Sequence, residues 1–88
     1  MNKQRSLSWG ELAELQNFAE NKYSYMDEET REQAIFEFVS GYIDGGKFAV
    51  FNSRNQFLAD FDVLDDAIAY KDENEPKNEI WSIEVVKF

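Results

Sequence analysis

The side chains that carry most enzyme chemistry are missing from this sequence. It contains no histidine and no cysteine, so the commonest general base and the strongest nucleophile are both absent. Catalysis by two carboxylates would need a deep cleft in which burial raises one pKa, and a chain of 88 residues leaves little room for one. We therefore expect a protein that is not an enzyme, with no catalytic residues, no metal site and no cofactor.

Two short motifs resemble ligand-binding loops but stand in the wrong context. Residues 41–47, GYIDGGK, match part of the P-loop pattern, yet a P-loop follows a strand, opens a helix and continues with Ser or Thr. This segment instead ends a predicted helix and continues with Phe48. Residues 72–75, DENE, suggest a calcium loop, but Pro76, Lys77 and Ile83 do not fit the EF-hand pattern. We interpret the first motif as helix-ending glycines and the second as a solvated loop.

Charge is the most distinctive chemical property of the chain. Eighteen acidic and nine basic residues give a formal net charge of -9, which repels nucleic acids and anionic membranes and attracts basic surfaces. The acids dominate two blocks, residues 8–46 and residues 60–79. We expect no direct binding to nucleic acid or membrane. Solvation alone could also explain such faces, since they keep a small protein soluble.

Two amphipathic helices are predicted in the first half of the chain. Ser8 and Glu11 have the spacing of a capping box, and Asp27 is predicted as a second N-cap. The helices should cover about residues 9–22 and 28–44, with Gly45 and Gly46 ending the second. Their short connection predicts a helical hairpin.

The second half changes to an extended pattern. Residues 48–51 and 57–61 flank a turn and predict a β-hairpin, Asp62 can cap a third, shorter helix, and residues 80–88 close the chain as a strand that is apolar on both faces. The predicted fold is α+β in the order ααββαβ. The helical hairpin packs on a small three-stranded, mostly antiparallel sheet with one crossover helix and the last strand beside the first.

We expect one domain over residues 1–88, with residues 1–7 flexible. The sequence has no cysteine and no long apolar run, so nothing in it argues for secretion or for a membrane span. We therefore expect the cytoplasm as the default location. The predicted core consists of apolar residues at helical or strand spacing: Leu12, Leu15, Ile35, Phe38, Val39, Tyr42, Val50, Phe57, Phe61, Leu64, Ile68, Trp81, Ile83 and Val85.

The candidate binding residues are acids that the predicted helices and the polar run after them present to solvent. Carboxylates on a rigid helix are held in place before binding, so pairing them with Arg or Lys of a partner costs little extra ordering. The candidates are Glu29, Glu32, Glu37, Asp44, Asp65, Asp66, Asp72, Glu73 and Glu75.

In size, charge and lack of catalytic groups, the chain resembles the small acidic proteins with which phages and mobile elements inhibit restriction or CRISPR enzymes. The acidic faces that carry this resemblance are those of Glu29, Glu32, Glu37, Asp65, Asp66, Asp72 and Glu73. The resemblance implies a DNA-mimic type of inhibitor or regulator that docks on the basic site of a nucleic-acid-handling protein. One alternative is a protein-interaction module or homo-oligomer that uses apolar contacts of the last strand. A small-molecule or nucleotide sensor is a third.

Overall fold

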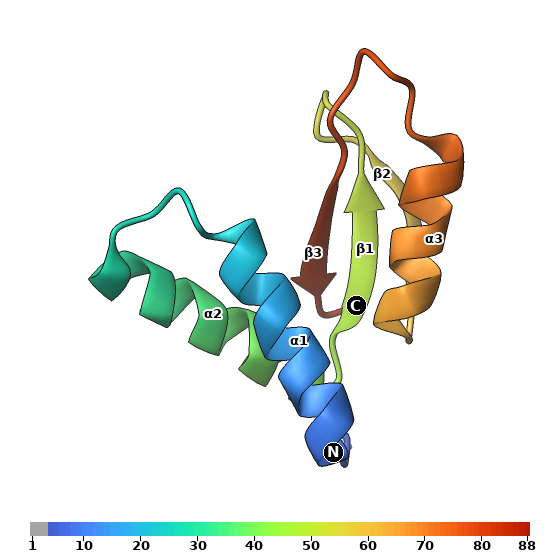
Figure 1. Cartoon of the computed structure of the whole chain (residues 1–88). Coiled ribbons are helices and arrows are strands. Elements are labelled where there is room, and N and C mark those ends of the chain that lie inside the picture. Colours follow the sequence, from blue (N-terminus) through green and yellow to red (C-terminus); the bar gives the residue numbers. More distant parts are fainter. Residues whose placement is uncertain (1–3) are drawn as a thin grey trace. The chain divides into compact units, whose positions relative to one another are not determined.

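The computed structural model describes residues 4–88 and has the predicted order of elements (Figure 1). These are α1 (Trp9–Lys22), α2 (Glu28–Ile43), β1 (Lys47–Phe51), β2 (Phe57–Phe61), α3 (Leu64–Asn74) and β3 (Ser82–Val86). They form two compact units, a helical unit that ends at Gly45 and a sheet unit, Gly46–Phe88. The α+β class is confirmed, while the single domain and the packing of the helical hairpin on the sheet stay predictions.

Both helices of the helical unit begin where the sequence predicts, and a short polar side chain caps each of them. The Ser8 hydroxyl accepts a hydrogen bond from the Glu11 amide at 3.1 Å, and the Glu11 carboxylate accepts one from the Ser8 amide at 3.1 Å. The Asp27 carboxylate caps α2 by accepting from the Thr30 amide at 2.9 Å. At the other end Gly45, with a φ of 101°, takes the left-handed conformation that glycine adopts without strain.

Phe38 is the centre of packing between α1 and α2. Its side chain is 3% exposed, and its ring lies 5.8 Å from that of Phe18 and 6.2 Å from that of Tyr23. Leu15, Ala19 and Val39 are also buried.

The segment before α1 is tied to the end of α2 through Arg5. Its backbone amide donates to the Ile43 carbonyl at 2.7 Å, and its guanidinium donates to the Tyr42 carbonyl at 2.8 Å and lies 4.3 Å over the Tyr42 ring. Because residues 1–3 lie outside the described part of the chain, the flexibility of residues 1–7 stays a prediction.

The sheet of the second unit is antiparallel throughout, with the strand order β2-β1-β3. This confirms that the last strand pairs with the first. Phe48 lies opposite Phe61 and Val85, and Val50 lies opposite Ala59 and Ile83. The connecting helix α3 buries Leu64 and Ala67 and contacts all three strands.

Two expectations for β2 and the helix after it were wrong. Phe57 is 51% exposed rather than in the core, because the register shifts between Val50 and Phe51 and places Phe57 opposite Phe51. Such a bulge moves a side chain to the other face of its strand. Asp62 does not cap α3, whose N-cap is Val63 without a side-chain hydrogen bond. The Asp62 carboxylate lies instead 3.9 Å from the Lys47 ammonium group.

The last strand is shorter than predicted, since β1 offers only five residues for pairing. Ile80 and Phe88 therefore lie outside β3 and are 85% and 76% exposed.

Six of the predicted core residues are buried: Leu15, Phe38, Val39, Val50, Leu64 and Ile83. Seven others are only half-buried: Leu12, Ile35, Tyr42, Phe61, Ile68, Trp81 and Val85. The prediction omitted Phe48 and Ala49, both fully buried on the central strand.

Candidate protein-binding site

Three of the candidate acids lie on α2 and are exposed to solvent. Glu29, Glu32 and Glu37, called the α2 acids below, are all exposed. At a rise of about 1.5 Å per residue, Glu29 and Glu37 lie about 12 Å apart along the helix axis. The Glu37 carboxylate also accepts a hydrogen bond from the side-chain amide of Gln33 at 3.1 Å. Asp44 differs from these acids because it is half-buried as the C-cap of α2 and accepts from the Gln4 side chain at 3.4 Å.

Four further candidates lie at the two ends of α3. Asp65 and Asp66 are in its first turn, Asp72 and Glu73 are in its last turn, and all four, called the α3 acids below, are exposed. Residues seven apart on a helix lie on nearly the same side, about 10 Å apart. The α3 acids thus form two short rows on adjacent parts of the helix surface.

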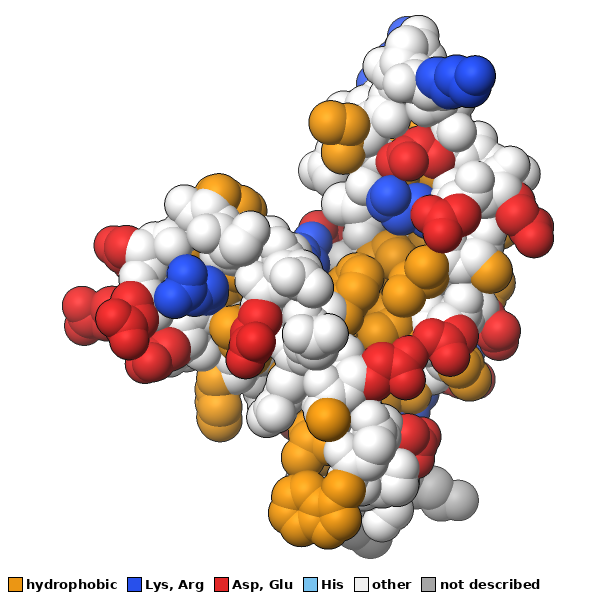
Figure 2. Space-filling view, in the orientation of Figure 1, with side chains coloured by type: hydrophobic (Ala, Val, Ile, Leu, Met, Phe, Trp, Pro, Cys, Tyr) orange, Lys and Arg blue, Asp and Glu red, His pale blue; other side chains and the backbone are white. Residues whose placement is uncertain are grey.

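Acidic side chains occur on both units in Figure 2. On the helical unit they gather toward the end where α1 connects to α2, and on the sheet unit they lie along the side that α3 forms. Each unit therefore carries its own acidic surface.

Glu75 is engaged inside the chain. One carboxylate oxygen accepts from the Trp81 amide at 2.6 Å, and the Lys71 ammonium group lies 3.2 Å from the same oxygen. The hydrogen bond from the Trp81 backbone is the main reason why the pKa of Glu75 lies below its ordinary value. We therefore assign Glu75 to the turn before β3 and leave it out of the proposed binding surface.

The role of Glu75 predicts a specific loss of stability in acid. Because its pKa is lower in the folded chain than in the unfolded one, its stabilisation is present above about pH 4.5 and is lost as pH falls through the folded value. The difference in unfolding free energy between the parent and Glu75→Gln should be largest at neutral pH and should shrink as the pH falls below about 4.5. Urea titrations at several pH values measure this difference, with the exposed Glu73→Gln as control. A difference that does not change with pH would contradict the assignment.

Three other carboxyl groups also have a pKa below the ordinary value. Hydrogen bonds to Ser8 lower the pKa of Glu11, those to Thr30 lower the pKa of Asp27, and those to Ser53 and Trp81 lower the pKa of Glu79. These carboxylates hold caps and turns, as Glu75 does. No cluster of three or more potential metal ligands occurs within residues 4–88. The absence of enzymatic activity and of cofactors stays a prediction.

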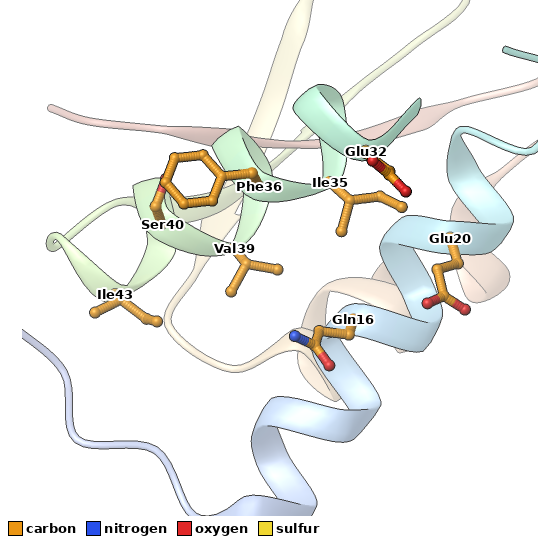
Figure 3. A pocket seen from close by; sticks show the side chains of 8 residues that line it. All are labelled: Gln16, Glu20, Glu32, Ile35, Phe36, Val39, Ser40 and Ile43. Carbon is orange, nitrogen blue, oxygen red and sulfur yellow. The ribbon is translucent and has the colours of Figure 1, made fainter. Parts of the chain in front are cut away.

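A groove between α1 and α2 was not predicted from the sequence. It has a volume of about 400 Å³. Figure 3 shows the side chains that line it: Gln16, Glu20, Glu32, Ile35, Phe36, Val39, Ser40 and Ile43. Helical spacing predicted Ile35 and Val39 as core residues, which gave no sign of a groove. The exposure of Phe36, at 65%, is the clearest sign that this side of α2 is open.

The sheet unit carries an exposed cluster of aromatic rings. The ring of Phe57 lies 6.0 Å from that of Phe51 and 5.9 Å from that of Phe88. Phe57 and Phe88 are 51% and 76% exposed. We call these three residues the aromatic cluster. Phe88 follows the last strand directly, and apolar contacts of that strand are the basis of the alternative function predicted from the sequence.

Comparisons with protein-family models, with curated proteins and with solved structures find no match for this chain. In the part that the structure describes, no helix combines the length and the apolar character needed to cross a bilayer. The acidic helices, the groove and the aromatic cluster are thus the features on which a function can be argued.

Proposed function

We propose that this chain is a non-enzymatic, acidic binding protein that inhibits or regulates a nucleic-acid-handling protein by docking on its basic site. The observation that carries the proposal is the exposure of the α2 acids and the α3 acids on regular helices. Three of these carboxylates are held on α2 and four on α3, in a chain whose formal net charge is -9.

Helix stability does not account for all of these acids. Negative charge is favourable in the first turn of a helix and unfavourable in the last, because of the helix dipole. This explains Asp65 and Asp66 in the first turn of α3 and Glu29 in the first turn of α2. Asp72 and Glu73 lie in the last turn of α3, where their charges oppose the dipole. A role in binding supplies a reason for their presence.

The chemistry of the proposed contact is charge-assisted hydrogen bonding. Arg can bind a carboxylate through two parallel hydrogen bonds, as it binds a phosphate. The acidic field would also speed encounter with a basic surface at low ionic strength. A site that normally holds nucleic-acid phosphates offers the required cluster of basic side chains, so the chain would compete with nucleic acid for it.

Competition by DNA and by salt tests the proposal. The tagged chain is used to capture proteins from a lysate of its host cells at about 0.1 M salt, and the bound fraction is then washed with duplex DNA or with about 0.5 M salt. We expect a captured nucleic-acid-handling protein that both washes release. Retention of that protein through both washes would contradict docking on its phosphate-binding site.

The aromatic cluster favours a second candidate function, an apolar interface that joins two copies of the chain or the chain and another protein. Phe57 and Phe88 expose large apolar rings, and apolar contacts weaken little as salt rises. Dimerisation that persists at high salt and is lost in Phe88→Ala would support this candidate.

A further inference from the structure

The apolar surface of α2 is wider than α1 covers. Phe38 packs against Phe18 and is 3% exposed, whereas Phe36 is 65% exposed. Two residues along an α-helix point about 200° apart. Hydrophobic side chains thus lie on two sides of α2, and within the helical unit the side that includes Phe36 opens on the groove.

The floor of the groove has the shape of a helix-binding surface. Ile35, Val39 and Ile43 follow one another at intervals of four residues, so they form a row about 12 Å long. Figure 3 shows this row along α2, with Phe36 on the same helix and Gln16 on α1 across from it. An amphipathic helix binds such a row through apolar side chains three or four residues apart, over about two turns.

Charge indicates what kind of helix would fit. Glu20 of α1 and Glu32 of α2 both line the groove and lie at the end opposite Ile43 in Figure 3. Among the described residues the lining contains no Lys or Arg. An acidic or uncharged occupant would displace water from these two carboxylates without forming an ion pair with them, which costs free energy. A Lys or Arg beside the apolar stripe would pair with them.

We propose that the groove between α1 and α2 binds a basic amphipathic helix of a partner protein. Its apolar side chains contact Ile35, Phe36, Val39 and Ile43, and its Lys or Arg residues pair with Glu20 and Glu32. The inference rests on the proposed function as a binding protein for basic partners and adds a defined site with a defined ligand shape. Glu32 belongs to both surfaces, whereas Glu29 and Glu37 do not line the groove.

A synthetic helical peptide of Leu and Lys, with all Leu residues on one face, is the probe for this site. Fluorescence anisotropy of the labelled peptide measures its binding to the full chain. Two peptides of equal length serve as controls, one with Glu in place of every Lys and one with the same Leu and Lys residues in an order that has no apolar face. We expect both to bind at least about five-fold more weakly.

Matched variants of the protein separate the groove from general acidity. The pair Glu20→Lys and Glu32→Lys, combined in one variant, and the pair Glu29→Lys and Glu37→Lys, combined in another, change the net charge equally. Because the second variant changes the same charge outside the groove, the first should weaken peptide binding at least about five-fold more than the second. Phe36→Ala should weaken it by a similar factor to the first, and circular dichroism checks that all variants fold.

Three results would overturn the groove assignment: equal losses in the two charge variants, unchanged binding by Phe36→Ala, or self-association of the parent through Phe36, which would make a second copy the occupant. If the groove variants leave peptide binding unchanged while a captured partner is still released by DNA, the proposed function stands without this site. If the peptide requires the groove but no captured protein is released by DNA, the groove stands and the proposed function fails.

Discussion

Replacement of Phe38 by Ala is expected to lower the free energy of unfolding by about 3 to 5 kcal/mol. The side chain is 3% exposed and lies against the rings of Phe18 and Tyr23. Its removal loses the transfer free energy of the ring and leaves a cavity that two helices cannot fully close. Because small domains are stabilised by only about 5 to 15 kcal/mol in total, the variant should be close to unfolding.

Phe36→Ala is a matched control on the same helix. Phe36 is 65% exposed, so its replacement by Ala should lower the free energy of unfolding by less than about 1 kcal/mol. Urea unfolding followed by circular dichroism measures both variants. A loss below about 1 kcal/mol for Phe38→Ala would show that the buried face of α2 is assigned wrongly.

The parts of the fold that depend on nearby residues follow directly from the sequence. The caps at Ser8 and Asp27 each link residues three apart, so their spacing alone placed the starts of α1 and α2. The exposed positions of the α2 acids and of the α3 acids likewise depend on the period of one helix. These acids were therefore predicted as surface residues without knowledge of the tertiary structure.

The predictions that failed concern features that depend on contacts between residues far apart in the sequence. The bulge that turns Phe57 outward depends on how β2 pairs with β1, and the hydrogen bond from Trp81 that engages Glu75 spans a loop. The groove depends on how far α1 covers α2, since an apolar stripe is the same in sequence whether its neighbour closes over it or not. Ile35 was consequently predicted as a core residue, although it lines an open groove.

Charge reversal of the acidic helices is the second expected large effect. One variant combines Glu29→Lys, Glu32→Lys and Glu37→Lys, and another combines Asp65→Lys, Asp66→Lys, Asp72→Lys and Glu73→Lys. At least one of them should bind the captured partner about ten-fold or more weakly, mainly through a slower on-rate, because reversed charges repel the basic surface before contact. The parent should show the same slower on-rate at high salt.

Neutral versions of the same variants, with Gln for Glu and Asn for Asp, provide the control. They remove attraction without adding repulsion, so each should weaken binding less than the corresponding reversal. Reversal of Asp65 and Asp66 also places positive charge in the first turn of α3, against the helix dipole. Circular dichroism must therefore show that the variants still fold before their rates are compared by surface plasmon resonance.

The aromatic cluster supplies the contrasting outcome. Phe88 is 76% exposed, and its ring contacts that of Phe57 on the sheet unit. Phe88→Ala removes apolar surface and leaves every charge in place, so under the electrostatic proposal it should hardly change the on-rate. If both charge-reversal variants bind like the parent while Phe88→Ala abolishes binding, the acidic helices are only solvated surface. The contact with the partner would then be apolar and would be made by the aromatic cluster.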